Sequence, residues 1–408
     1  MRTWKDRRVV LGVCGGIAAY KAVLLLRAIQ RAGASVRVVM TEAATRFVGP
    51  LTFEALSESR VGLDPDFLGI GTGGATHIEW AREADLVLVA PCTATTLARI
   101  AHGMADNLLS AIVLASRCPV MLVPSMHTGM WQAHATQQNL RLLDPDRFHW
   151  MPPDTGDLAS GDRGPGRFPE VEEILQEAAY ALGPRDLQGR VFVVTAGPTR
   201  EPMDPVRVLT NPSTGRMGIE LARAALRRGA EVRLVLGPTE VAPPRALAKV
   251  PLQLQRVTTC REMLEATRAF LQGADALLMA AAPADQAPLS ADPRKRRKEE
   301  LPDLLALSRT PDILATLVPE TRGKIVLAFA AETGDLVSAG SDKRARKGAT
   351  LLFANAVGQG RGFGAVDNGG WLIGPEGPPE EILPISKEDL ADLLIDRLRD
   401  RLPARATS

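Results

Sequence analysis

The segment 195–218 carries the strongest chemical signal in the chain. It reads T-A-G-P-T-R-E-P-M-D-P-V-R-V-L-T-N-P-S-T-G-R-M-G and lies between an apolar run at 191–194 and a helical pattern at 219–228. Long loops inside α/β domains are uncommon and are usually functional. A Ser-Thr-Gly turn at a helix start offers unpaired backbone N–H groups and the positive end of the helix dipole. The segment therefore predicts phosphate chemistry in the middle of the chain.

The N-terminal half holds weaker signals that each allow two interpretations. Gly15 and Gly16 follow an apolar strand and can hold a phosphate, but any tight turn before a helix needs glycine. Thr93 follows another apolar strand, where it can contact a ligand or simply cap a helix. His77 opens a predicted helix and is either a base or a solvent-facing residue of the first turn. The turn after the first strand, with glycines at 12, 15 and 16, does not read G-x-G-x-x-G, so the dinucleotide fingerprint is absent there.

The elements that must position these residues follow one plan twice. Each half has a strand, a turn, a helix that ends in Gly-Ala, and a second strand, and the helix ends read R-A-G-A-S-V-R-V-V and R-R-G-A-E-V-R-L-V. Continuous apolar strands that alternate with helices are typical of parallel sheets covered on both faces. We therefore expect an α/β protein of two doubly wound, mainly parallel-sheet (Rossmann-like) domains, 1–183 and 184–408, with ligands at the carboxyl ends of the strands. The predicted elements are strands at 9–13, 36–40, 84–91, 191–194, 232–236 and 274–279, and helices at 18–32, 171–180 and 219–228.

Composition excludes several classes of function. The chain has 408 residues, of which 49 are basic and 47 are acidic, so neither nucleic acid nor a membrane surface is an expected partner. The four cysteines are widely spaced, which disfavours a zinc site or a disulfide framework and favours a reducing, cytoplasmic location. No apolar run approaches the length of a membrane span.

Two further segments lack a clear helix or strand pattern. The stretch 152–169 contains four glycines and three acidic residues, and we expect an irregular, mobile flap there. The stretch 288–302 contains the charge run R-K-R-R-K-E-E at 294–300, which is usually a solvated surface.

Taken together, these segments resemble two known enzyme families. The stretches G-G-I-A-A-Y-K (15–21), T-H-I-E (76–79), A-D-L-V-L-V-A-P (84–91) and G-M-A-D-N-L (103–108) resemble flavin-dependent cysteine decarboxylases. The stretches T-A-G-P-T-R-E-P-M-D-P-V-R (195–207) and N-P-S-T-G-R-M-G (211–218) resemble phosphopantothenate–cysteine ligase. Their order and the chain length resemble the bacterial bifunctional family that joins both activities in coenzyme A biosynthesis.

The resemblance implies a CTP-dependent ligase in the domain 184–408. It implies that 4′-phosphopantothenate is activated as an acyl-cytidylate, with Mg²⁺ held mainly by the CTP phosphates and Asp285 as a candidate ligand. Asn211 and Lys295 would be catalytic, since Asn211 can orient the reacting group and Lys295 can stabilise its charge. The residues implied for the nucleotide are Ala281, Asp285, Lys295, Pro311, Asp312, Ile313, Leu314, Phe329, Lys343 and Lys347.

The resemblance also implies a decarboxylase in the domain 1–183, which uses FMN to convert 4′-phosphopantothenoylcysteine to 4′-phosphopantetheine. Gly15, Gly16, Thr41 and Thr93 would lie by the flavin or its phosphate, and His77 would be the catalytic base. The implied assembly is a homo-oligomer of decarboxylase trimers joined through ligase dimers.

The decarboxylase motifs depart from the family at two catalytic positions. The motif P-x-M-N-x-x-M is here 124–130, with His127 at the position of the substrate-orienting asparagine. The motif A-C-G-D-x-G-P-G-R is here 159–167, with Ser160 at the position of the proton-donating cysteine. An alkyl hydroxyl is a far poorer acid than a thiol, whose pKa is about 8.5. Either this half works with an altered acid, or it binds flavin and completes the reaction poorly, in which case Ser160→Cys raises the rate.

Two other functions remain open from the residues alone. Glu42, just past the second strand, lies where a ribose-binding acid would belong in a nicotinamide-dependent oxidoreductase. A flavin-binding protein without decarboxylase turnover is the other alternative. Flavin absorbance of the purified protein would distinguish a flavoprotein from a nicotinamide-dependent oxidoreductase. CTP-dependent pyrophosphate release would distinguish the bifunctional enzyme from a flavin-binding protein without turnover.

Overall fold

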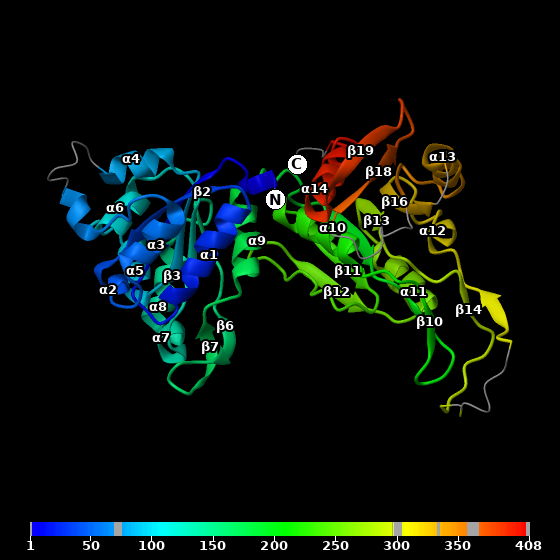
Figure 1. Ribbon diagram of the computed structural model, residues 1–408, viewed down its shortest axis with the longest axis horizontal. Helices are drawn as coiled ribbons and strands as arrows, with labels where there is room; N and C mark the ends of the chain where they lie inside the picture. Colours follow the sequence, from blue (N-terminus) through cyan, green and yellow to red (C-terminus); the bar gives the residue numbers. More distant parts are fainter. Residues whose placement is uncertain are drawn as a thin grey trace. The chain divides into compact units, whose positions relative to one another are not determined.

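The computed structural model describes residues 2–68, 76–295, 297, 304–332, 335–356 and 367–404. The chain forms two compact units, residues 1–184 and 185–408 (Figure 1). No helix in these described ranges is long and apolar enough to cross a membrane.

Unit 1 is built on a five-stranded parallel sheet in the order β2-β1-β3-β4-β5. A separate antiparallel hairpin, β6–β7, follows the sheet in sequence. The elements are η1 (Arg2–Trp4), β1 (Arg8–Val13), α1 (Ala19–Arg31), β2 (Ser35–Met40), α2 (Glu42–Thr45), α3 (Pro50–Ser57), η2 (Asp64–Leu68), α4 (Thr76–Glu83), β3 (Leu86–Cys92), α5 (Ala94–Ala101), α6 (Leu108–Ala115), β4 (Val120–Pro124), α7 (Thr128–Gln132), α8 (His134–Leu142), β5 (Phe148–Trp150), β6 (Asp154–Asp157), β7 (Arg163–Arg167) and α9 (Val171–Leu182).

Both faces of this sheet are covered by helices. Alternate residues of one strand enter different cores: Val9 and Leu11 pack with α1, α3 and α9, whereas Val10 packs with α5, α6 and α8. Because successive side chains of a strand point to opposite faces, this division requires a layer of helices on each side. The strands are therefore apolar throughout, as the sequence pattern predicts.

Unit 2 is built on an eight-stranded sheet in the order β12-β11-β8-β13-β16-β17-β18-β19. The strands from β12 to β17 are parallel, and β18 and β19 pair antiparallel at one edge (Figure 1). The elements are β8 (Val191–Ala196), β9 (Arg200–Pro202), β10 (Val208–Thr210), α10 (Arg216–Arg227), β11 (Glu231–Leu236), β12 (Leu252–Arg256), α11 (Cys260–Phe270), β13 (Ala276–Met279), β14 (Gln286–Pro288), β15 (Leu307–Arg309), α12 (Ile313–Thr316), β16 (Ile325–Glu332), α13 (Leu336–Arg346), β17 (Leu351–Ala356), β18 (Asp367–Ile373), β19 (Glu380–Ser386) and α14 (Lys387–Arg399).

These two sheets confirm the predicted α/β class with doubly wound, mainly parallel sheets. In unit 1 the chain passes from β1 to β2 on one side and then to β3 on the other. In unit 2 it passes from β8 to β11 on one side and, after β12, to β13 on the other. The carboxyl ends of β1 and β8 are therefore topological switch points, where open α/β sheets bind ligands.

Two stretches predicted as loops contain regular structure. The flap stretch 152–169 was expected to be irregular, and that expectation is wrong in part, because β6 and β7 pair antiparallel within it. The long loop 195–218 likewise contains the short hairpin β9–β10, and α10 begins at residue 216, three residues before its predicted start. The four strands are only three to five residues long, and all but β10 contain Gly or Pro, so none shows an apolar alternation long enough to reveal it.

Candidate active sites

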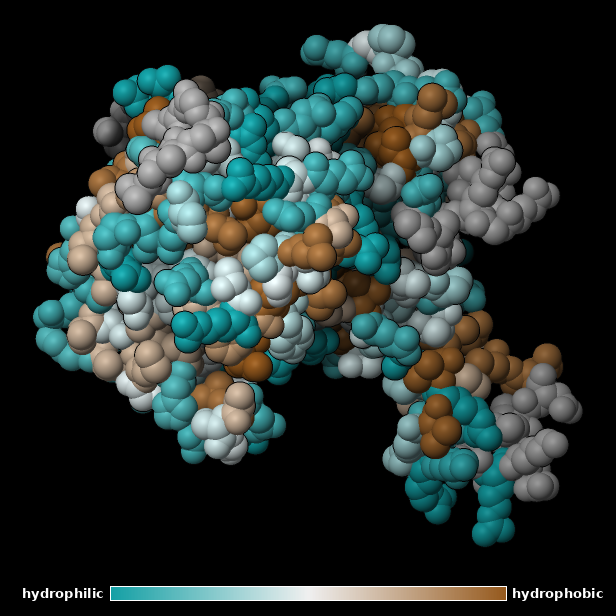
Figure 2. All heavy atoms as spheres, turned by 60° about the vertical axis from the view of Figure 1, so that its left-hand side comes forward, coloured by the Kyte–Doolittle hydropathy of each residue, from teal (hydrophilic) through white to brown (hydrophobic). Residues whose placement is uncertain are grey.

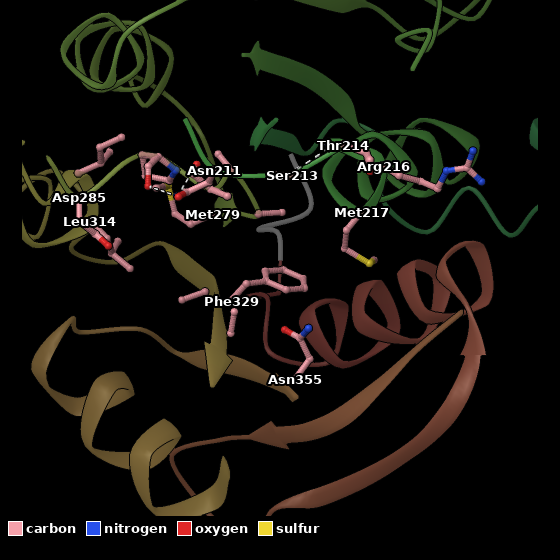
Figure 3. Close-up of a pocket in the computed structure, with 18 of the residues that line it drawn as sticks. Asn211, Ser213, Thr214, Arg216, Met217, Met279, Asp285, Leu314, Phe329 and Asn355 are labelled. Carbon is pink, nitrogen blue, oxygen red and sulfur yellow. Dashed lines mark hydrogen bonds between the residues drawn. The ribbon is translucent and has the colours of Figure 1, made fainter. Parts of the chain in front are cut away.

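Unit 2 has a cavity of about 300 Å³ at the carboxyl ends of its parallel strands (Figure 3). In Figure 3, Asn211, Met279, Asp285 and Leu314 gather on one side, while Phe329 and Asn355 lie on another. The lining residues come from the turn before α10, from the ends of β13, β16 and β17, and from α12 and α13. The parallel register of these strands brings segments that are far apart in sequence to one edge.

The side chain of Asn211 is fixed by two main-chain carbonyls. Its amide nitrogen donates to Pro283 O at 2.9 Å and to Ala282 O at 3.3 Å. These bonds tie the end of the β9–β10 hairpin to the segment after β13. Because the amide nitrogen is occupied in this way, the acceptor Oδ1 is the atom that Asn211 presents to a ligand.

The turn before α10 presents a helix N-terminus to the cavity. Gly215 is the N-cap residue and has φ +75°, a left-handed conformation that glycine adopts without strain. Its amide donates to the Ser213 hydroxyl at 3.3 Å. Gly218, in the first turn, packs so closely on β8 that a Cβ there would lie 2.5 Å from the Ala196 Cβ. This close approach brings the positive end of α10 to the cavity that Ser213 and Thr214 line.

Positive side chains outnumber acidic ones around this cavity. Its lining includes Lys343, Lys347, Lys387 and Arg216, against Asp285 and Asp312. These cations and the helix N-terminus together suit a polyanionic ligand.

Asp312 is engaged within the wall of the cavity. Lys347 Nζ lies 3.2 Å from its carboxylate, and the Ala315 amide donates to it at 3.1 Å. Burial raises the pKa of Asp312, but these hydrogen bonds and the Lys347 charge lower it more, so the pKa lies below its ordinary value. Asp312 is therefore a carboxylate at neutral pH, and it holds Lys347 beside α12.

Most residues predicted for the nucleotide line this cavity. They are Ala281, Asp285, Asp312, Ile313, Leu314, Phe329, Lys343 and Lys347, together with Asn211. Pro311 lies outside the lining, where its carbonyl accepts a hydrogen bond from the Cys260 thiol. Lys295 is exposed after β14 and does not line the cavity; of the charge run that contains it, residues 296 and 298–300 lie outside the described residues.

Sequence reasoning missed four polar residues of the lining: Arg216, Asn355, Asn368 and Lys387. Asn355 lies near the end of β17, where a polar residue after an apolar run is a usable signal. Arg216 follows the Ser-Thr-Gly turn and could have been included with it. Lys387 begins α14, about 170 residues after Arg216 in the sequence. No local sequence pattern identifies it as a residue of this cavity. Burial and the nearby charge of Arg216 lower the pKa of Lys387.

Unit 1 has a cavity of about 490 Å³ that opens at the switch point of its sheet. Among the predicted residues, Gly15, Gly16, Thr93, His127 and Ser160 line it. A Cβ on Gly15 would collide with Ala43, whereas the space around Gly16 is open. Thr93 both lines the cavity and caps α5, because its hydroxyl accepts a hydrogen bond from the Thr96 amide at 3.4 Å. The two interpretations of Thr93 are therefore compatible.

Thr41 and His77, also predicted for this site, do not line the cavity. Thr41 follows β2 as the N-cap residue of α2, and His77 lies in the first turn of α4 with its ring 5.2 Å from that of Phe67. Thr41 Oγ1 and His77 Nδ1 are both buried, and neither finds a hydrogen-bond partner among the described residues. Buried polar atoms without partners are rare in proteins, and each calls for a ligand, a water or a neighbour.

The two residues that depart from the decarboxylase motifs are joined through a third. His127 Nε2 lies 2.8 Å from Asp162 Oδ2, and the Ser160 hydroxyl donates to the same oxygen at 3.0 Å. Hydrogen bonds from His127 and Ser160 hold the pKa of Asp162 below its usual range. The β6–β7 hairpin is thereby attached to the turn before α7. The spacing of the motifs gave no indication of this contact.

The described residues contain no group of three or more His, Cys, Asp or Glu side chains arranged to hold a metal ion. The four cysteines are all free. Burial raises the pKa of the Cys14, Cys92, Cys118 and Cys260 thiols. They are therefore protonated near neutral pH.

Comparison with known proteins identifies both units. Residues 2–182 match the model of the Flavoprotein family, and residues 187–402 match that of the DNA/pantothenate metabolism flavoprotein C-terminal domain. The coenzyme A biosynthesis bifunctional protein CoaBC of Mycobacterium tuberculosis (strain ATCC 25618 / H37Rv) is 41% identical over 408 residues, covering 96% of each chain. The CoaBC protein of Escherichia coli (strain K12) is 39% identical over 405 residues, covering 97% of each chain.

Among solved structures, the C-terminal domain of a coenzyme A biosynthesis bifunctional protein CoaBC is 31% identical. It covers 53% of this chain and 97% of its own, with a TM-score of 0.45. The sequence relatives extend over nearly the whole chain, and each of the two family models falls within one compact unit. The chain therefore belongs to the CoaBC family of bifunctional coenzyme A biosynthesis enzymes.

Proposed function

We propose that unit 2 joins 4′-phosphopantothenate to cysteine with CTP, and that unit 1 converts the resulting 4′-phosphopantothenoylcysteine to 4′-phosphopantetheine with FMN. The observation that carries the ligase assignment is the convergence of Asn211, Lys343, Lys347 and the N-terminus of α10 on one cavity. A site for an acyl-nucleotide needs cations for the phosphates and a polar group for the acyl part. This cavity offers both.

The ligase reaction has two displacements. A carboxylate oxygen of 4′-phosphopantothenate attacks the α-phosphorus of CTP, a new O–P bond forms, and the bond to pyrophosphate breaks. The cysteine amine then attacks the acyl carbon, an amide C–N bond forms, CMP leaves, and the amine loses its proton. Lys343, Lys347 and the amides at the start of α10 stabilise the phosphate charge that increases on the leaving group.

The remaining ligase residues position the two substrates. Asn211 Oδ1 accepts a hydrogen bond from the phosphopantothenoyl group, because its amide nitrogen is already bound to the main chain. Phe329, whose ring lies 5.7 Å from that of Phe353, packs on the cytosine with Ala281 and the cavity-lining residues 312–314. Lys295 stabilises the acyl centre when the segment after β14 approaches the bound substrates.

In this site Mg²⁺ would be held mainly by the CTP phosphates. The cavity lining has two carboxylates, and Asp312 is already engaged by Lys347 and the Ala315 amide. One remaining carboxylate, that of Asp285, fits an ion that takes most of its ligands from phosphates and water. Asp285 is therefore the candidate protein ligand.

The residues of unit 1 fit a flavin mononucleotide. Thr41 Oγ1 and His77 Nδ1 are buried polar atoms in need of partners, and the open space at Gly16 suits a phosphate at the end of β1. When bound, FMN supplies the two-electron oxidation and reduction of the substrate. His77 acts as the base that takes the substrate proton, and Thr93 and Gly15 hold the cofactor in place.

Each unit also exposes apolar side chains suited to self-association. In unit 2, Val206, Leu289 and Leu304 are 61%, 69% and 88% exposed near the β9–β10 and β14–β15 hairpins, and Figure 2 shows hydrophobic side chains gathered there. In unit 1, Ile17 and Leu24 are more than half exposed at the start and on the outer face of α1. Patches of this kind mark interaction sites. They support self-association through each unit, and the proposed form is the one that the resemblance implies, a dimer through unit 2 and a trimer through unit 1.

Product analysis tests the two activities together. The purified protein is incubated with 4′-phosphopantothenate, cysteine, CTP and Mg²⁺, and the products are identified by mass spectrometry. Phosphopantetheine is the expected product. Phosphopantothenoylcysteine alone would leave the ligase assignment standing and overturn that of the decarboxylase, and the absence of both products would overturn the ligase assignment. Light-scattering mass measurement of the same sample tests the proposed assembly.

A further inference from the structure

The two departures from the decarboxylase motifs meet at one atom. His127 comes from the turn before α7, and Ser160 and Asp162 come from the turn between β6 and β7. Both His127 Nε2, at 2.8 Å, and Ser160 Oγ, at 3.0 Å, bond to Asp162 Oδ2. Residues that look independent in the sequence therefore form a single hydrogen-bonded unit.

The hydrogen bonds around His127 assign its tautomer. The Gly129 amide donates to Nδ1 at 3.1 Å, so Nδ1 carries a lone pair and the ring proton lies on Nε2, facing Asp162. A carboxylate that holds one ring N–H fixes the imidazole and leaves the other nitrogen to gain and lose a proton. In the neutral ring Nδ1 accepts from the Gly129 amide, so this bond must break before Nδ1 can carry a proton to a substrate.

The hairpin is packed against the turn that carries His127. The Met126 amide donates to Gly166 O at 3.1 Å, and the Ser125 hydroxyl donates to the same oxygen at 3.3 Å. A Cβ at Gly164 would lie 2.4 Å from the Thr128 hydroxyl, so only glycine permits this approach. His127 and Ser160 both line the 490 Å³ cavity as a result.

The His127 side chain lies at the cavity and is open to solvent. Its side chain is 46% exposed, which gives it access to water. The charged side chains that line the same cavity are Lys21 on α1, Asp157 on β6 and Arg167 on β7. Arg167 is paired with Glu170. Asp162 is the charged group in direct contact with the ring.

We propose that His127 is the acid that protonates the product of unit 1, and that Asp162 is the positioning residue that holds it. The proposal rests on the decarboxylase function above. The step begins with the enethiolate that remains after carbon dioxide has left. Nδ1 of the imidazolium gives its proton to the carbon that lost carbon dioxide, so that an N–H bond breaks, a C–H bond forms, and a thioaldehyde and neutral imidazole remain. Bound reduced FMN would supply the hydride that converts the thioaldehyde to the thiolate of the product. Water returns the proton.

Asparagine at position 127 tests this role sharply, because it is the residue that the decarboxylase motif has there. An acid role predicts that His127→Asn lowers phosphopantetheine formation by about 10²- to 10⁴-fold. Flavin bleaching and carbon dioxide release in the first turnover continue, because they precede the proton transfer. Asp162→Asn lowers product formation in the same sense. His134→Asn on α8, the same substitution at an exposed histidine outside the cavity, is the matched control.

Rescue by a thiol separates an acid from a structural residue. Ser160→Cys introduces the motif's proton donor, so the double variant with His127→Asn regains product formation. The rate of trypsin cleavage after the exposed Arg163 measures how firmly the β6–β7 hairpin is held in place. We expect this rate to be the same in His127→Asn as in the wild type. Full activity of His127→Asn, or a loss of activity that Ser160→Cys does not rescue, would overturn the proposal. A wild-type protein that neither bleaches flavin nor releases carbon dioxide would instead overturn the decarboxylase function on which the proposal rests.

Discussion

The side-chain amide nitrogen of Asn211 lies 2.9 Å from the main-chain carbonyl oxygen of Pro283. The two residues are 72 positions apart, one at the end of the β9–β10 hairpin and one after β13. Their hydrogen bond joins two segments that line the cavity of unit 2. Any change at Asn211 therefore affects both the ligand contact and the wall of the cavity.

We expect Asn211→Asp to abolish most ligase activity. The carboxylate cannot donate to Pro283 O and would face two carbonyl oxygens, so the side chain turns away and adds a negative charge beside the substrate carboxylate. Loss of one positioned polar group in an active site typically costs about 10²- to 10³-fold in kcat. Pyrophosphate release measures the effect, and carbon dioxide release by unit 1 of the same variant is the internal control. Unchanged pyrophosphate release would remove Asn211 from the site.

Gly218→Ala is expected to raise the KM for CTP and to lower the stability of unit 2. The added Cβ would lie 2.5 Å from the Ala196 Cβ and 2.8 Å from Thr195 O, so the first turn of α10 must move away from β8. Overpacking of this kind costs about 1–3 kcal/mol. Urea unfolding and CTP titration measure the two effects. Gly49→Ala, where no atom lies within 4 Å of the new Cβ, is the matched control and should change neither.

Thr41→Val separates cofactor binding from folding. The Thr41 hydroxyl is buried without a partner among the described residues, so its replacement by an isosteric methyl should leave the melting temperature of the flavin-free protein unchanged or raise it. If this hydroxyl binds FMN, the dissociation constant for FMN rises by about tenfold, the loss of roughly one hydrogen bond to a charged group. Fluorescence titration measures the constant. A lower melting temperature with unchanged FMN affinity would contradict the prediction.

Acid is expected to weaken unit 2 through Asp186. Arg228 donates to this carboxylate at 2.8 Å, and Arg399 donates to it at 2.9 Å. Burial raises the pKa of Asp186, but the hydrogen bonds and charges of the two arginines lower it more, so the folded pKa lies below the unfolded value. The stabilisation is therefore fully present above about pH 4 and is lost as the pH falls through the folded pKa.

The measurement for Asp186 is urea unfolding between pH 7 and pH 3. The wild-type free energy of unfolding falls with acid, and Asp186→Asn, which does not titrate, starts lower at pH 7 and falls less. Asp146→Asn, at an exposed aspartate in a turn of unit 1, is the control and should keep the wild-type slope. Parallel slopes for wild type and Asp186→Asn would exclude the ion pair as a source of acid sensitivity.

The positions of the main strands could be predicted from the sequence because these strands are buried on both faces. A parallel strand covered by two helical layers must be apolar throughout, so 9–13 and 191–194 were recognisable without any contact information. The Ser-Thr-Gly turn before α10 was predictable for a related reason, since a helix that starts at a switch point needs small residues and free amides. Local sequence therefore determined the α/β class, the repeated plan and the turn at which α10 begins.

Only the tertiary structure decided which distant residues meet. Lys387 comes to the ligase cavity from the last helix, and His127 and Ser160 meet on Asp162 because a glycine-rich hairpin packs against the turn before α7. Such contacts depend on the register of parallel strands and on close packing at glycines, and neither leaves a pattern in the nearby sequence. The sequence specified the chemical groups, and the packing of the sheets decided which of them share a site.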